Sequence, residues 1–188
     1  MNRRVVAVVG VVVGALVVLG VIGTLAGDKD EPAPPIAGDL PADVVCQPET
    51  AHPPTGASVH RAGEIAYDRV PPNSGEHNPN WLRVIRRVFE PSDGAAVEQA
   101  VHNLEHGYVV VWYDPARADL AALEGAIEFV GERKLFAMPW TRGGLPSSYV
   151  LTAWGHERRC SGISRAAIRD FFGAHGGENG DAPEANGP

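Results

Sequence analysis

The chain has 188 residues, with 16 Lys and Arg against 23 Asp and Glu, and a formal charge of -7 at pH 7. Arg3 and Arg4 are the only charged side chains in residues 1–27, so the remainder carries 14 basic and 23 acidic residues, or a formal -9. Because nucleic-acid binding requires clustered Lys and Arg, this balance argues against a nucleic-acid partner.

An uncharged apolar run from Val5 to Ala26 follows the two arginines. About 20 apolar residues in a helix span the ~30 Å core of a bilayer, so residues 1–27 are predicted to form a cytoplasmic stub and a transmembrane signal anchor. The arginines favour a cytoplasmic N-terminus, which predicts a single-pass protein of the cell membrane whose remaining residues are extracytoplasmic. A cleaved signal peptide is the alternative, although its apolar region is normally shorter, at ~7 to 15 residues.

Two segments rich in proline, glycine and charge flank the rest of the sequence. Residues 28–45 are predicted to form a stiff, Pro-rich linker, and residues 176–188 a disordered tail, because neither can bury enough apolar surface to fold alone. Between them lie residues 46–175, which are long enough for one extracytoplasmic domain with one core.

The first half of this domain is predicted to alternate strands, a loop and a helix. A Pro-, Asn- and Gly-rich loop is expected at residues 70–81, between short strands at 63–67 and 82–90. Ser92 and Asp93 are candidate caps for a helix over residues 94–106, which Gly107 would end. The uncharged run 108–113 (YVVVWY) is typical of a buried strand.

The second half contains an amphipathic helix, two strands and a final helix. The helix is expected at residues 118–134, the strands at 135–140 and 148–154, and a Ser-capped helix at 164–172. This order predicts an α+β fold, a small mixed β-sheet with helices packed on it. A thioredoxin-like arrangement would have the same order.

Cys46 and Cys160 are the only two cysteines, and they lie near opposite ends of the predicted domain. On the oxidising side of a membrane a disulfide between them is the simplest interpretation. Two free thiols, or two thiolate ligands of a metal, are the alternatives.

Three sequence blocks resemble those of the bacterial family DUF3105, whose function is unknown. They are Y-x-x-V-P-P-N-S-G-E-H at residues 67–77, V-H-N-L-E-H-G-Y-V-V-V-W-Y at 101–113 and L-T-A-W-G at 151–155. The resemblance implies a small exported or anchored domain and no established activity. Asn73 stands where the family usually has Thr, and either residue can hold a turn through a side-chain hydrogen bond.

The second block places His102, Glu105 and His106 on one face of the predicted helix, because residues three and four apart are neighbours there. His77, which ends the Pro-rich loop, could supply a third imidazole. His60 resembles a further histidine position of the family and is the fourth candidate. Imidazole ligands suit zinc or Cu(II), whereas Cu(I) prefers sulfur. Glu105 could bind the metal directly or accept a hydrogen bond from a metal-binding histidine.

Two other interpretations remain open. In the first, His102 and His106 cap the helix end, Asn103 and Glu105 hold the loop by hydrogen bonds, and the domain is a structural or partner-binding module of the cell envelope. In the second, the HxxEH spacing is that of inverzincin peptidases, with a third acidic ligand from Glu124, Glu128 or Glu157. Three further histidines are assigned to the surface: His52, His156 and His175.

Overall fold

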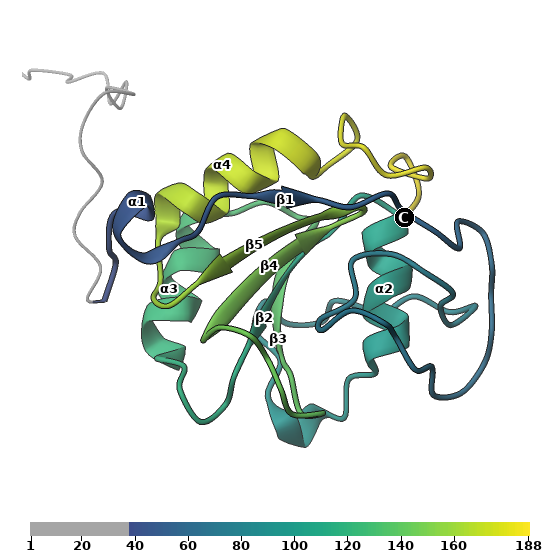
Figure 1. The fold of residues 1–188 in the computed structure, drawn as a ribbon, viewed down its shortest axis with the longest axis horizontal. Coiled ribbons are helices and arrows are strands. Elements are labelled where there is room, and N and C mark those ends of the chain that lie inside the picture. The colour runs from purple at the N-terminus through teal and green to yellow at the C-terminus, as the bar shows by residue number, and fades with distance from the viewer. Residues whose placement is uncertain (1–37) are drawn as a thin grey trace, which may run out of the picture. The chain divides into compact units, whose positions relative to one another are not determined.

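The computed structural model describes residues 38–188, and Figure 1 shows a sheet with helices on both of its faces. The predicted membrane anchor, residues 1–27, and most of the predicted linker lie outside the described residues. Within residues 38–188, no helix has both the length and the apolar character needed to cross a bilayer.

A mixed five-stranded sheet forms the centre of the fold. In spatial order its strands are β1 (Thr50–Ala51), β5 (His156–Cys160), β4 (Tyr149–Ala153), β2 (Val109–Tyr113) and β3 (Leu135–Pro139). β2 and β3 are parallel, and the other neighbouring pairs are antiparallel. The parallel pair requires a crossover, which α3 (Leu120–Val130) provides. The predicted α+β class with a mixed sheet is confirmed, and the thioredoxin-like arrangement stays a prediction.

Successive residues of β2 point to opposite faces of the sheet and enter two separate cores. Val109 and Val111 pack with α3 and α4 (Arg165–His175). Val110 and Trp112 pack with α2 (Val97–Glu105) and with loops on the other face. Figure 1 shows α2 on the opposite side of the sheet from α3 and α4. Covering both faces explains why β2 is fully buried and carries no charge.

The predicted helices and the longer apolar strands are confirmed, with shifted ends. Ser164 caps α4 by accepting a hydrogen bond from the Ala167 backbone at 3.2 Å. Gly107, with φ +79, follows the end of α2 as expected. Ser92 and Asp93 do not cap α2, because they belong to the 3-10 helix η1 (Pro91–Asp93), and α2 begins at Val97.

Two predicted strands are wrong, and two strands are missed, the two-residue β1 and the longer β5. Residues 63–67 are irregular, because the Ile65 backbone donates to the Glu98 carboxylate and not to a neighbouring strand. In residues 82–90 only Val88 forms a bridge, to Ala137 of β3. The longer missed strand, β5, has the sequence HERRC, in which Glu157 and Cys160 are buried, so no alternating apolar pattern marks it.

Both ends of the described chain pack more closely than the sequence analysis expects. In the predicted linker, residues 42–45 form α1 (Ala42–Val45), and Asp39 accepts hydrogen bonds from the Arg165 backbone and guanidinium. Residues 176–188, expected to be a disordered tail, instead bury Ala182 and Ala185 against the α2 side of the sheet.

Cys46 and Cys160 form the expected disulfide, 114 residues apart in the sequence. The bond joins the segment that follows α1 to the last residue of β5. It therefore ties the start of the described domain to its sheet.

Replacing both cysteines by serine should lower the free energy of unfolding by about 2–5 kcal/mol, because closure of so long a loop restricts the unfolded chain. Urea denaturation of the oxidised wild type and of the Cys46→Ser, Cys160→Ser variant measures the difference. Wild type treated with reductant is the control and should match the variant. Equal midpoints for the oxidised wild type and the variant would contradict the prediction.

Candidate metal centre

The polar side chains of α2 are buried, which is uncommon for a short helix with apolar residues facing a sheet. Val101 and Leu104 pack on the sheet. Glu98, Asn103 and Glu105 are at most 4 % exposed, and they face the irregular segment 58–82 instead of solvent. Buried polar groups require hydrogen-bond partners, so the segment must supply them.

The backbone of residues 58–82 supplies those partners. Glu105 accepts a hydrogen bond from the Ser58 N–H. Asn103 accepts from the Leu82 N–H at 2.7 Å and donates to the Leu82 carbonyl at 3.0 Å. The helix side chains therefore fix a segment that has no regular secondary structure of its own.

Backbone pairing within this segment brings His60 beside His77. The Arg61 N–H donates to the His77 carbonyl at 2.8 Å, and the His77 N–H donates to the Val59 carbonyl at 3.1 Å. The two ring centroids are 4.9 Å apart. Residues 17 positions apart in the sequence thus present their imidazoles to one place.

Four of the five predicted ligands form one group. His60, His77, His102 and Glu105 each offer a ligand atom, and these atoms all lie within 4.8 Å of one another. His106 is adjacent, with its Nε2 atom 3.1 Å from Nε2 of His102, but it falls in a separate group with Glu105 and Glu184.

Hydrogen bonds to backbone carbonyls indicate which nitrogen of two of these histidines carries the proton. His77 Nδ1 lies 2.8 Å from the Gly75 carbonyl, and His102 Nδ1 lies 2.6 Å from the Asn78 carbonyl. A carbonyl only accepts, so each Nδ1 donates, and each neutral ring keeps a lone pair on Nε2. In many metal sites the ligating histidine is oriented in this way.

Two buried atoms at the centre have no hydrogen-bond partner among the described residues. They are Nε2 of His77 and Oε2 of Glu105, which lie 2.9 Å apart with both side chains fully buried. The distance is that of an ion pair, which forms when His77 carries a second proton on Nε2, whereas in the neutral ring protonated on Nδ1 a lone pair faces the carboxylate oxygen. A cation between the two atoms would satisfy both.

Burial lowers the pKa of His102 below its usual value of 6.5, and the nearby imidazoles of His77, His106 and His60 lower it further. The hydrogen bond to the Asn78 carbonyl opposes this shift without reversing it. His102 is therefore neutral at pH 7, which is the form that binds metal.

Comparison with known proteins gives a family and no activity. The family model described as a protein of unknown function, DUF3105, matches residues 58–188. The chain belongs to the DUF3105 family. No curated protein and no solved structure matches it. The match covers the whole metal-centre segment, and it extends through the tail to Pro188.

In this DUF3105 chain the centre lies next to the surface on the side of His60 and Trp81. Both residues are exposed, and Trp81 is 41 % exposed although its ring lies 5.9 Å from His102 and 5.7 Å from His106. His60 is the exposed member of the group, whereas His77, His102 and Glu105 are buried, so the group meets solvent on this side. Trp81 was not predicted from the sequence, because a single aromatic residue in a polar loop does not indicate a binding site.

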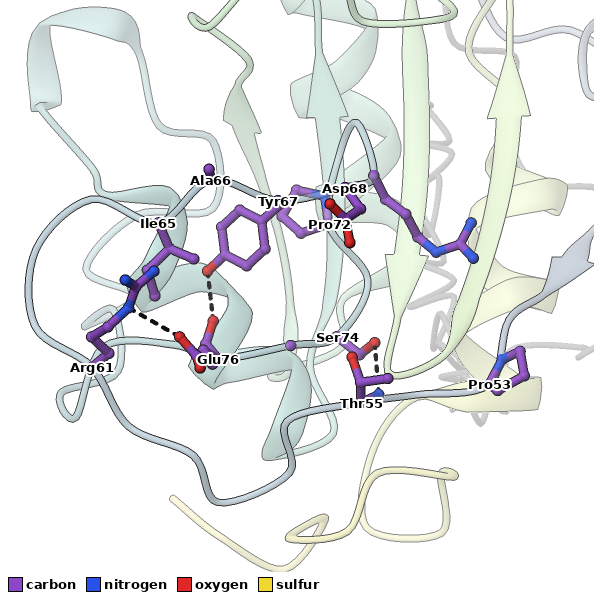
Figure 2. Close-up of a pocket in the computed structure, with 12 residues that line it drawn as sticks. Pro53, Thr55, Arg61, Ile65, Ala66, Tyr67, Asp68, Pro72, Ser74 and Glu76 are labelled. Carbon is purple, nitrogen blue, oxygen red and sulfur yellow. Dashed lines mark hydrogen bonds and ion pairs between the residues drawn. The ribbon is translucent and has the colours of Figure 1, made fainter.

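A pocket of about 580 Å³ lies beside the same loop, but none of the histidines lines it. Figure 2 shows its residues, with Arg61 and Tyr67 directed toward Glu76. Arg61 forms an ion pair with Glu76 at 3.0 Å, and the Tyr67 hydroxyl donates to the Glu76 carbonyl at 2.9 Å. These contacts hold the residue next to His77, so the pocket walls support the loop that carries this histidine.

A second histidine cluster involves His156 and His175, which the sequence analysis assigns to the surface. Their rings stack 3.8 Å apart, and both contact Glu49 and Asp181. With Glu49 they form another group whose ligand atoms lie within 4.8 Å of one another. Their ion pairs with Glu49 and Asp181 join the residue before β1, β5, α4 and the tail.

The acids required by a peptidase-like centre lie elsewhere. Glu124 and Glu128 belong to α3, on the opposite face of the sheet from α2. Glu157 pairs with Arg159 at 2.6 Å on β5. None of the three joins the groups that contain Glu105. Glu105 itself faces the histidines as a candidate ligand, which is not the free general base of the inverzincin interpretation.

Asn73 does not hold its turn as the sequence analysis proposes. Its side chain is fully buried, and neither amide atom has a hydrogen-bond partner among the described residues. Its backbone carbonyl instead accepts from the Gly155 N–H at 2.8 Å. The main chain at this position joins the first and third sequence blocks of the family.

The metal-free chain should lose stability as the pH falls from 7 toward 5. Unfolded His102 takes up a proton near its usual pKa of ~6.5, whereas burial disfavours protonation in the folded state, so this contribution is present above pH 6.5 and lost below it. In His102→Gln the free energy of unfolding should depend less steeply on pH. Urea titrations in chelator at several pH values measure the slope, and an unchanged slope in the variant would contradict the assignment.

Proposed function

We propose that this protein is a transition-metal-binding domain, with His60, His77, His102 and Glu105 as ligands of one zinc or Cu(II) ion. One observation carries the proposal: His77 Nε2 and Glu105 Oε2 are buried 2.9 Å apart without a hydrogen-bond partner in the described chain. With the His77 ring neutral, two electron-rich atoms are buried face to face, which costs several kcal/mol unless a bound cation compensates them.

The ligand types suit a metal ion of intermediate softness. Three imidazoles and one carboxylate suit zinc and Cu(II) and offer no sulfur for Cu(I). Zinc binds imidazole nitrogen at ~2.0–2.1 Å, so ligand atoms around one tetrahedral ion lie ~3.4 Å apart. The four ligand atoms all lie within 4.8 Å of one another, and His77 Nε2 and Glu105 Oε2 are 2.9 Å apart, so small side-chain movements would bring them to this spacing. His60 is exposed and is the ligand best able to move.

A location at the cell membrane fits this function. We propose that residues 1–27 anchor the chain and that the domain is extracytoplasmic. The Arg-flanked apolar run supports the anchor, and the Cys46–Cys160 disulfide suits an oxidising compartment. An envelope protein is the partner class that such a location would offer.

A structural or partner-binding role is the second candidate. The hydrogen bonds from Asn103 to Leu82 and from Ser58 to Glu105 favour it, because they show that helix side chains hold the loop. A metallohydrolase has less support, since the expected acidic ligands are absent from the groups around Glu105.

The full chain, purified in detergent, should bind zinc or Cu(II). His77→Gln and His102→Gln should each lower the metal affinity by at least ~10-fold, because even residues that only hydrogen-bond to a ligand contribute that much. Calorimetric titration and elemental analysis measure affinity and content. His52→Gln, outside the cluster, is the matched control. If the wild type binds no metal and the two variants only destabilise the metal-free chain, the structural role is correct.

Protease added to intact spheroplasts should digest the domain from residue 38 onward, because it would lie outside the cytoplasmic membrane. Immunoblotting for the domain follows the digestion, with a cytoplasmic protein as the control for leakage. Digestion that occurs only after lysis would contradict the proposed location.

A further inference from the structure

Glu105 lies between two groups of ligand atoms and belongs to both. Its Oε2 atom faces His77 in the first group. The second group contains Glu105, His106 and Glu184, whose ligand atoms again lie within 4.8 Å of one another. The Nε2 atom of His106 is 3.3 Å from Oε2 of Glu184. A carboxylate with two oxygens can bind one ion with each of them.

The tail places Glu184 beside this group through several backbone contacts. The Glu184 N–H donates to the Glu105 carbonyl at 3.0 Å. The Lys134 ammonium donates to three carbonyls, those of His106 at 2.8 Å, Ala185 at 2.7 Å and Gly187 at 2.8 Å. The Lys134 side chain therefore joins the end of α2 to the residues that follow Glu184.

Two glycines allow the tail to approach the end of α2 this closely. The Gly177 N–H donates to the Gly107 carbonyl at 2.8 Å, and a Cβ on Gly107 would lie 2.6 Å from the Gly177 carbonyl oxygen. A Cβ on Gly187 would lie 2.8 Å from Nδ1 of His106. The glycine that ends the HNLEHG block is thus required for tail docking as well as for ending the helix.

Occupation of the first group would change the partner of His106. Nε2 of His106 lies 3.1 Å from Nε2 of His102, which has a lone pair because its Nδ1 donates to Asn78. Once His102 binds an ion, this lone pair can no longer accept a hydrogen bond. His106 is then available to ligate on the side of Glu184.

We infer that His106, Glu184 and Glu105 bind a second divalent cation, so that Glu105 bridges a two-ion centre. This inference rests on the proposed function, because the two ions share Glu105. One imidazole and two carboxylates form a harder donor set than the first group, and they suit zinc better than Cu(I). Known two-metal sites hold their ions ~3.5–4 Å apart.

Zinc stoichiometry of the full chain tests the second ion. Calorimetric titration and elemental analysis should give about two equivalents for the wild type. Glu184→Gln should bind about one equivalent with the affinity of the first site unchanged, and His106→Asn should do the same. Glu178→Gln is the matched control, because it removes an exposed carboxylate from the same tail, and it should still bind about two equivalents.

The outcomes separate the two proposals. One equivalent in the wild type, or two in Glu184→Gln, overturns the second ion and leaves the first site in place. No zinc in the wild type, with no Cu(II) either, overturns both. The Glu184 side chain is 46 % exposed and glutamine has nearly its shape, so this variant should fold, and a thermal melt of the metal-free protein checks it. If a folded Glu184→Gln variant binds no zinc at all, the inference of two separable sites is also overturned.

Discussion

Burial of the polar face of α2 is the constraint on which the metal-centre side of the fold depends. A buried carboxylate or imidazole without partners costs several kcal/mol, so each polar side chain on this face requires a backbone group opposite it. Ser58, Ile65 and Leu82 supply N–H donors to Glu105, Glu98 and Asn103. The segment 58–82 therefore takes one path although it forms no strand or helix, and α2 acts for it as a neighbouring strand would in a sheet.

The helices and strands that could be predicted from the sequence are those whose residue pattern is visible within a short stretch of chain. β2, β3 and β4 are fully buried and carry no charge, and α3 and α4 have amphipathic spacing with polar N-caps, so their type can be recognised from a few residues. β5 was missed, because strand HERRC gains its stability from pairing with β4, which is not visible locally. The wrongly predicted strand at 63–67 shows the same limit. Isoleucine is typical of strands, but the backbone N–H of Ile65 donates to the side chain of Glu98 and not to a neighbouring strand.

The same distinction applies to the candidate site. The i, i+4 spacing placed His102 near His106, and the Pro-rich loop suggested His77, because helix period and turn residues are local features. The division of the ligands into two groups was not predictable, since it depends on pairing between residues 59–61 and His77 and on the return of the tail. Glu184 lies in a Gly-, Pro- and Ala-rich segment that resembles a disordered tail. Its packing requires Lys134, 50 residues earlier in the chain.

The same hydrogen bonds support both the structural and the metal-binding interpretation. The carbonyls of Gly75 and Asn78 hold the loop by accepting from His77 and His102, and the same bonds leave both Nε2 lone pairs unprotonated. A purely structural loop would gain more if Glu105 Oε2 also received a donor, because an unsatisfied buried oxygen costs ~1–3 kcal/mol. Nε2 of His77 lies 2.9 Å away and supplies that donor only if the ring carries a second proton. The two interpretations therefore differ in what balances one buried carboxylate, a second proton on His77 in the structural role or a bound cation in the function that we propose.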